Sequence, residues 1–450
     1  MLKPLAASLA LALAWPMAAR ADTTTDISAL RDEIAAIRAA YENRLRALEE
    51  RLRAAEAATA AAPAAAAAAP PAPPPAPVAV PAAAGGSANA FNPALSLILS
   101  GTATRTSQDP SRYAITGFAL PAGAEIGPGT RGFSLGESEL GFAASIDPWW
   151  RGAANISLSP DDTVAVEEAW VQTTGLGNGL TFKAGRFFSS VGYLNSQHAH
   201  TWDFVDNPLA YQALLGTQYG DDGVQLAWIA PTDLYLELAA ELGRGRSYPG
   251  SNTGRNGAGM AALALHAGGD VGDSHSWRAG LSVLQAKADD LDLTTSLGDN
   301  SSLTQRFTGR TRVWVADAVW KWAPGGNATR QNLKLQGEVL RSTRDGTLDM
   351  TAATRAVQSG WYLQGVWQFM PRWRVGLRTE RLDPGRTDGL PTLASGFRPG
   401  RNSLMLDFSA SEFSRLRLQV AQDRAREGVT DHQIFLQYQM SLGAHGAHSY

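Results

Sequence analysis

Cysteine is absent from this sequence of 450 residues, which excludes disulfide bonds and cysteine-bound metal sites. No run approaches the roughly 20 apolar residues that a membrane-spanning helix needs, and the formal net charge of −3 argues against nucleic acid as a partner. The sequence also lacks a Gly-x-Ser-x-Gly motif, a P-loop and a Cys/His cluster, so we do not expect an enzyme. The lack of cysteine suits a chain that is exported through an oxidising compartment.

The N-terminus has the features of an export signal. Residues 1–21 contain Lys3, an apolar run from Leu5 to Ala14, and the small-residue site Ala19-Arg20-Ala21. About ten apolar residues are too few to span a bilayer. We therefore predict cleavage, with a mature chain that begins at Asp22.

Two low-complexity segments follow the signal. Residues 22–57 are predicted to form a helix that associates with copies of itself, because no core lies nearby for its apolar stripe to pack on. Residues 58–90 form an Ala/Pro-rich linker with Pro70-Pro71, which is predicted to be an extended spacer. The apolar residues of the stripe recur at steps of three and four, with one skip in phase at Arg44: Ile27, Leu30, Ile34, Ile37, Tyr41, Leu45, Leu48, Leu52 and Ala55.

Residues 91–450 alternate between apolar and polar positions. Near the C-terminus, Ile434, Leu436 and Tyr438 fall on one face and Gln437 and Gln439 on the other. A period of two indicates strands with one apolar face, and its repetition behind an export signal predicts an all-β, transmembrane antiparallel barrel. Sixteen strands are predicted: 94–105, 132–146, 150–159, 163–174, 180–190, 221–229, 233–243, 259–267, 275–286, 309–322, 331–344, 357–369, 373–383, 401–410, 414–426 and 432–443.

The links between these strands alternate in length. Short turns such as Asp147-Pro148 and Met370-Pro371-Arg372 alternate with long links at 107–131, 191–220, 244–258, 289–308, 345–356 and 384–400. Short periplasmic turns and long external loops are typical of an outer-membrane barrel. The short links at 160–162 and 427–431 depart from this pattern. Tryptophans such as Trp149, Trp228 and Trp373 adjoin the short turns, where an interfacial girdle is expected.

A polar face is predicted to line the interior of the barrel. Sixteen strands enclose a space wide enough for water, and the lining charges are of both signs, without a ring of one sign. The predicted lining residues are Glu137, Glu139, Arg151, Glu237, Glu241, Lys334, Glu338, Arg374, Arg378, Arg415 and Arg417.

The third external link, residues 191–220, is too long for a simple connection, so we expect it to fold inward and constrict the pore. The predicted constriction residues are Tyr193, Gln197, His198, His200, Trp202, Asp203 and Asp206. His198 and His200, with the two aspartates nearby, are chemically able to bind Zn²⁺. Histidine pairs in loops are also often hydrogen-bonded to neighbours, and both alternatives stay open. No other cofactor is expected.

The barrel sequence resembles the phosphate-selective and carbohydrate porins of Gram-negative bacteria. The resemblance lies in the layout and in stretches such as 166–172 (VEEAWVQ), followed by 180–187 (LTFKAGRF) before the long third link. Stretches 132–140 and 196–203 resemble a proteobacterial group often labelled TonB-dependent or zinc-regulated receptors. The resemblance implies a sixteen-stranded barrel and passive or facilitated diffusion. A TonB-dependent receptor would need a globular plug, whereas only coil and linker precede this barrel.

Three functions follow as hypotheses. The first is an outer-membrane porin for small hydrophilic solutes or ions, a homotrimer by the porin-like context, with its coil in the periplasm. The second is an outer-membrane receptor or channel for zinc or a metal complex. The third is a structural tether between the outer membrane and the cell wall.

Overall fold

The computed structural model describes residues 93–251, 254, 256–297, 301–388 and 396–443. The chain divides at Gly85, and the described residues all belong to its second unit, Gly86–Tyr450. The predicted signal, coil and linker therefore lie outside the described residues. Within the described residues, no helix has the length and hydrophobicity that crossing a bilayer requires.

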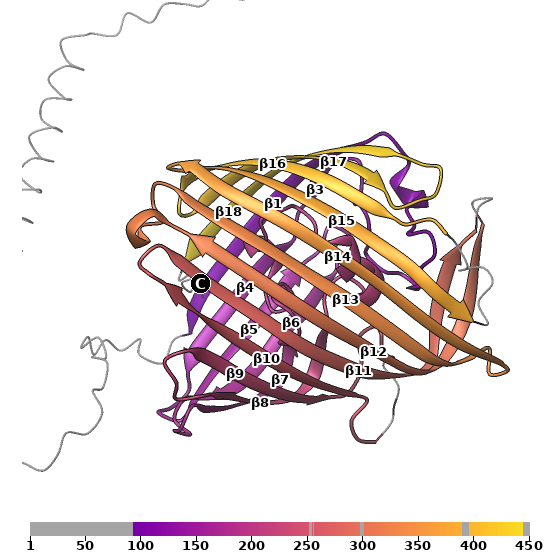
Figure 1. Ribbon diagram of the computed structural model, residues 1–450, viewed down its shortest axis with the longest axis horizontal. Helices are drawn as coiled ribbons and strands as arrows, with labels where there is room; N and C mark the ends of the chain where they lie inside the picture. Colours follow the sequence, from indigo (N-terminus) through magenta and orange to yellow (C-terminus); the bar gives the residue numbers. More distant parts are fainter. Residues whose placement is uncertain (1–92, 252–253, 255, 298–300, 389–395, 444–450) are drawn as a thin grey trace, which may run out of the picture. The chain divides into compact units, whose positions relative to one another are not determined.

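The second unit is a closed antiparallel barrel (Figure 1). The ring closes because β1 pairs with β4 on one side and with β18 on the other, so that Leu97 lies opposite both Leu140 and Leu442. The prediction of sixteen wall strands is confirmed in the described part of the chain, where β3 continues β4 as one interrupted strand. The wall consists of β1 (Ala94–Thr106), β3 (Gly132–Leu135), β4 (Ser138–Ser145), β5 (Trp150–Leu158), β6 (Val164–Thr173), β7 (Leu180–Phe188), β8 (Gly220–Ile229), β9 (Tyr235–Gly243), β10 (Met260–Val271), β11 (His275–Ser296), β12 (Ser302–Trp322), β13 (Asn332–Leu348), β14 (Ala352–Met370), β15 (Trp373–Asp388), β16 (Gly400–Ser411), β17 (Ser414–Arg424) and β18 (Asp431–Gly443).

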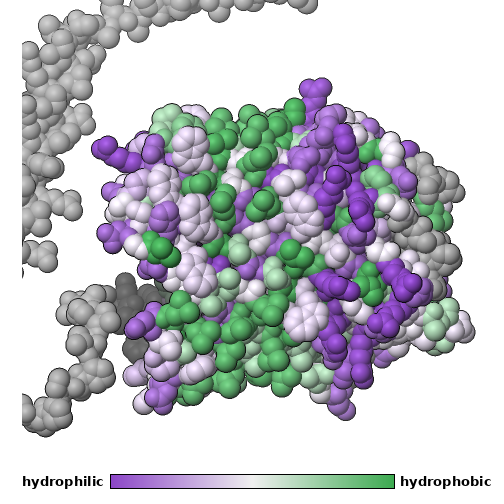
Figure 2. Space-filling view, viewed as in Figure 1, coloured by the Kyte–Doolittle hydropathy of each residue, from purple (hydrophilic) through white to green (hydrophobic). Residues whose placement is uncertain are grey.

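The wall is polar inside and apolar outside, the reverse of a water-soluble barrel. In β17, for example, Arg417 and Gln419 are buried, while Leu416 and Leu418 are each 43% exposed. Figure 2 shows hydrophobic side chains across the outer face of the strands, with hydrophilic side chains on either side of them. Aliphatic side chains can face outward at this density because lipid covers the outside of a transmembrane barrel.

The wall is uneven in height. β5, β6 and β7 have nine or ten residues, close to the 9–11 that cross a bilayer, whereas β11 and β12 have 22 and 21. The predicted bounds of the links at 289–308, 345–356 and 384–400 were wrong. Much of the described length of these links continues the neighbouring strands as external hairpins. In these hairpins the outward face is polar, as at Asp292, Thr294 and Arg306, while the inward face keeps buried apolar residues such as Leu293 and Phe307. The outward apolar alternation that identifies the strands therefore ends before the backbone pairing does.

Two external links pack together within the barrel. The first, residues 107–131, contains the 3₁₀ helix η2 (Pro110–Arg112) and the short strand β2 (Leu120–Pro121), which pairs with β11. The link between β7 and β8, residues 189–219 and hereafter loop 3, contains η3 (Ala199–Thr201) and the helix α2 (Leu209–Leu215). Their shared apolar core includes Ile115, Phe118 and Leu214, and it rests on inward residues of the wall such as Leu284 and Leu340. The turn between β12 and β13 contains η4 (Pro324–Gly326).

Candidate functional site

Loop 3 begins on two glutamates of the barrel wall. Glu241 of β9 accepts a hydrogen bond from the Ser190 backbone N–H at 2.9 Å. Glu338 of β13 accepts hydrogen bonds from the backbone N–H groups of Tyr193 and Leu194, at 3.1 and 3.0 Å. These carboxylates therefore hold the start of the loop against the inner wall.

Glu338 also anchors the helix of the loop. The hydroxyl groups of Tyr211, in α2, and Tyr362, in β14, donate to its two oxygens at 2.8 and 2.6 Å. Gly192 has φ of +71°, and a Cβ there would lie 2.3 Å from Glu338 Oε2. The chain can pass this close to the carboxylate because the residue is glycine.

A third glutamate caps α2. Glu380 of β15 accepts a hydrogen bond of 2.5 Å from the Leu209 backbone N–H, at the first residue of the helix. The helix ends at Gly216 in the left-handed conformation, with φ of 65°. Every residue from Leu209 to Leu215 is buried, and the helix packs against β13, β14 and β15. Loop 3 is thus fixed inside the barrel along its whole length.

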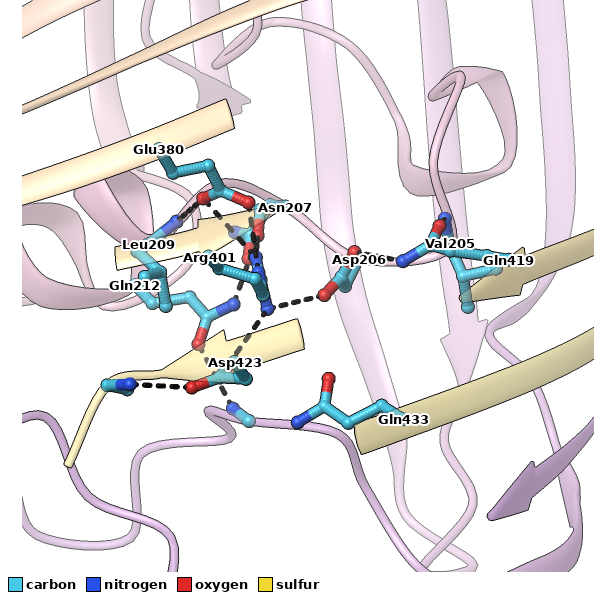
Figure 3. Close-up of polar contacts among 12 residues, drawn as sticks. Val205, Asp206, Asn207, Leu209, Gln212, Glu380, Arg401, Gln419, Asp423 and Gln433 are labelled. Atoms are coloured by element: carbon cyan, nitrogen blue, oxygen red, sulfur yellow. Dashed lines mark hydrogen bonds and ion pairs between the residues drawn. The ribbon is translucent and has the colours of Figure 1, made fainter. Parts of the chain in front are cut away.

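The centre of loop 3 is bound by arginines. Arg401 of β16 lies between Glu380 and Asp206, with Nε 2.9 Å from Glu380 and a terminal nitrogen 2.6 Å from Asp206 (Figure 3). Arg378 of β15 also contacts Asp206, at 2.6 Å, and Glu380, at 2.9 Å. Burial alone would raise the pKa of Asp206, but the charges of Arg401 and Arg378 lower it to about 2. Asp206 is therefore a carboxylate at neutral pH.

Asp203, three residues before Asp206, is also held by two cations of the wall. Lys334 and Arg374 lie 2.5 and 3.2 Å from its two oxygens. Burial raises the pKa of Asp203, but these two cations outweigh burial and hold the pKa well below its ordinary value. The two aspartates therefore serve as anchors for the loop. They do not join the histidines, as the sequence had suggested for a metal site.

Two arginines of β17 bind the backbone between the histidines and the aspartates. Arg415 donates to the carbonyl oxygen of His200 and Arg417 to that of Trp202, each at 2.8 Å. The Trp202 indole N–H in turn donates to the Gln197 carbonyl at 2.9 Å. The orientation of the histidine side chains is therefore set by a fixed backbone.

The histidines point to the opposite part of the wall, where glutamates gather. Glu139 of β4 has Oε2 3.1 Å from His198 Nδ1 and 3.1 Å from His200 Nδ1. His198 also contacts Glu167 through Nδ1, at 3.2 Å, and Glu168 through Nε2, at 3.0 Å. Burial lowers the pKa of His198, but the three glutamates around it outweigh burial and raise the pKa well above its ordinary value. The cluster strongly favours positive charge.

Two β-bulges create this cluster. Between β3 and β4 the register with β1 shifts by one residue, from Gly101↔Leu135 to Ile98↔Glu139. In β6, Glu168 pairs with Asn155 but Val166 pairs with Ile156, so Glu167 is an extra residue. A bulge re-aims side chains that strict alternation would separate. Consecutive glutamates can therefore face the same histidine.

The structure places the predicted lining residues on the inner side of the wall. Glu137 lies in the break between β3 and β4, beside Glu167. Arg151 and Lys183 flank the ring of Trp170 at 5.5 and 5.0 Å. Of the other predicted lining residues, those that face loop 3 are Glu139, Glu241, Lys334, Glu338, Arg374, Arg378, Arg415 and Arg417.

Several site residues were missed from the sequence. Glu237 was predicted as lining, but its partner His266, 3.0 Å away, was not. Arg401 follows the inward alternation of β16 and could have been found by it, as Glu380 was found by the alternation of β15. The pair Glu167-Glu168 breaks the alternation of β6, and that irregularity was the available signal for a bulge.

Comparisons with known proteins give one sequence relative. An Aquifex aeolicus (strain VF5) protein described as "Uncharacterized protein" is 31% identical over 346 residues, which are 71% of this chain and 70% of the relative. No family model matches the chain.

Among solved structures, the chain is similar to the outer membrane channel DcaP of Acinetobacter baumannii, with 12% identity and a TM-score of 0.49 over 79% of this chain and 99% of that one. It is also similar to an anion-selective porin from Comamonas acidovorans, with 11% identity and a TM-score of 0.49 over 78% and 99%. A third similar structure is OprB of Pseudomonas putida, with 13% identity and a TM-score of 0.44 over 78% and 94%.

Proposed function

We propose that this chain, which belongs to the same family as the Aquifex aeolicus protein, is an outer-membrane channel through which small hydrophilic solutes or ions diffuse past loop 3. The observation that carries the proposal is the closed ring of strands with polar inward and apolar outward side chains. Such a wall is stable only in a bilayer, and its interior is suited to polar solutes.

The two sides of the interior suggest where solutes pass. On the side of β13–β17, Arg378, Arg401 and Arg417 are less than 2% exposed because loop 3 covers them. On the side of β6 and β7, the inward residues Glu168, Trp170 and Lys183 remain half-buried. We therefore propose that loop 3 narrows the channel and that the path runs past Trp170 and Lys183, beside the point where His198 of the loop contacts Glu167 and Glu168. Lys183 would then act on passing ions.

Single-channel recording in a planar bilayer tests the proposal. We expect discrete conductance steps from the purified mature protein, and a shift of the zero-current potential toward cation preference in Lys183→Glu. The control is Lys287→Glu, which makes the same charge change at an outward position of β11. A folded, heat-modifiable barrel that shows no conductance steps would overturn the proposal.

We further propose that the channel is a homotrimer whose coil lies in the periplasm. The heptad stripe of residues 22–57 supports self-association. The part of the wall formed by the short strands β5, β6 and β7 supports contact between barrels. There, Val164 and Val166 of β6 face outward and are 67% and 40% exposed. The size of the purified complex in detergent, measured by light scattering, tests this assembly.

A further inference from the structure

We propose that Glu139, His198 and His200 bind a divalent transition-metal ion of the Zn²⁺ type inside the barrel. This site does not depend on diffusion through the channel, so the two proposals can fail separately. Its ligands also differ from those expected from the sequence, because Glu139 of the wall takes the place of Asp203 and Asp206.

The ligand atoms already have the spacing of a metal site. The Nδ1 atoms of His198 and His200 each lie 3.1 Å from Glu139 Oε2, and the three atoms lie within 4.8 Å of one another. Bonds of about 2.0–2.1 Å to a tetrahedral zinc ion leave ligand atoms about 3.3 Å apart. A small movement would therefore complete the coordination.

Glu139 lacks the partner that this position requires. The residue is 5% exposed, and its Oε2 accepts no hydrogen bond of good geometry, although two imidazole nitrogens lie 3.1 Å away. When the imidazoles are protonated they form ion pairs with this oxygen, and a bound metal ion would take the place of their protons. An unpaired buried carboxylate oxygen aimed at two imidazoles is the second, independent observation for a site.

The surroundings of His198 orient it as a ligand. Its Nε2 lies 3.0 Å from Glu168 Oε2, so this nitrogen can carry the proton and donate it to the carboxylate. The Nδ1 lone pair then faces Glu139 and is available to a metal. In zinc sites a ligating histidine usually donates its far N–H to a carboxylate in this way. Asn155 Nδ2 is also 3.0 Å from Nε2, and because two donors cannot share this contact, a protonated Nε2 requires the Asn155 amide to turn its oxygen toward the ring.

Three glutamates surround His198, and their negative charge favours a divalent cation. Glu167, 3.2 Å from His198 Nδ1, can supply a fourth ligand, and Glu137 lies beside it. Imidazole ligands favour zinc-type ions over Ca²⁺ and Mg²⁺, which prefer oxygen. The side chains of His198 and Glu167 are 15% and 16% exposed, so an ion can enter from the interior. The bound ion would join loop 3 to β4.

Isothermal titration of the full mature protein with ZnCl₂ tests the site. All proteins carry His445→Ala and His448→Ala, so that the tail histidines add no background. We expect one tight site per chain, at least tenfold weaker binding in Glu139→Gln, and no site in His198→Gln/His200→Gln. Glu168→Gln, a positioning change, should weaken binding about 10–100-fold. MgCl₂ should not compete.

The matched control is His266→Gln. His266 is a buried wall histidine 3.0 Å from Glu237, but without a second imidazole beside it, so its replacement should leave zinc binding unchanged. Heat-modifiable mobility on gels establishes that each variant is folded. Equal binding by wild type and by His198→Gln/His200→Gln, or no binding by the folded wild type, would overturn the proposal. If the folded wild type bound no zinc, a proton shared between Glu139 and the histidines would explain their close contacts instead.

Discussion

Gly192 is the residue at which the attachment of loop 3 can be broken with least other change. A methyl group there would lie 2.3 Å from Glu338 Oε2 and 2.8 Å from the Tyr211 hydroxyl, in a left-handed backbone. We predict that Gly192→Ala separates the loop from Glu338 and gives larger and noisier single-channel conductance. Gly254→Ala, in an external link where a Cβ meets nothing within 4 Å, should leave the conductance unchanged. Equal traces for both variants would contradict this role.

Arg401 illustrates how a buried charge differs from an exposed one. Its side chain is 0% exposed and pairs with Asp206 and Glu380, so Arg401→Met would leave two buried carboxylates short of a partner. Breaking a buried pair in this way typically costs about 3–5 kcal/mol. We predict a loss of that size in the free energy of unfolding by urea in lipid vesicles.

Arg398 provides the matched comparison for Arg401. It pairs with Asp383 at 3.3 Å, but the two side chains are 68% and 45% exposed. Exposed pairs contribute about 0–1 kcal/mol. Arg398→Met should therefore be close to neutral, and similar losses in both variants would mean that loop 3 does not depend on its buried ion pairs.

The docking of loop 3 inside the barrel should persist in acid. The pKa values of Asp203 and Asp206 are lower in the folded protein than in the unfolded chain, and that of Asp206 is about 2. Their pairs with Lys334, Arg374, Arg378 and Arg401 therefore stabilise docking fully above the unfolded value of about 3.9, and the contribution is lost as pH falls toward 2. We predict a conductance that stays at its neutral value from pH 7 to about 4.5 and increases irreversibly or becomes noisy only near pH 2–3. Release of the loop at pH 5–6 would instead implicate groups with ordinary or raised pKa values.

The strands were predictable because a lipid-covered wall imposes a strict alternation on the sequence. Stretches such as Leu416, Leu418 and Val420 against Arg417 and Gln419 leave no other assignment. The outer ends of β11–β15 escaped prediction because their outward face is polar. Backbone pairing continues in those hairpins without an outward apolar stripe, and apolar residues such as Leu293 and Phe307 face inward.

The interior was less predictable than the wall. Alternation indicates that Leu284 and Leu340 face one side, but not that apolar inward residues would meet the helix of loop 3. Likewise, the two histidines were visible as candidate ligands, whereas Glu139 joins them only through contacts between distant elements. The bulge at Glu167 depends on a single extra residue, and its sign in the sequence is the interruption of the β6 alternation by Glu167-Glu168.

At the scale of the whole molecule, the assembly and the channel should be separable. Deletion of residues 26–57 removes the predicted coil but none of the described barrel residues. We predict that the deleted protein loses the trimer in light scattering, or dissociates at lower detergent concentration, while each barrel keeps its unit conductance. The reason is that the ring of strands closes within one chain, through β1 and β18.

The same deletion separates the channel from the tether hypothesis. A tether would lose its attachment to the cell wall in fractionated envelopes, whereas a channel would keep its solute flux in intact cells. A scrambled 26–57 segment with the same composition serves as the control, because it preserves length and charge but not the heptad seam. If the deletion abolished unit conductance in a folded barrel, the pore would require neighbouring copies, and the one-chain channel would be wrong.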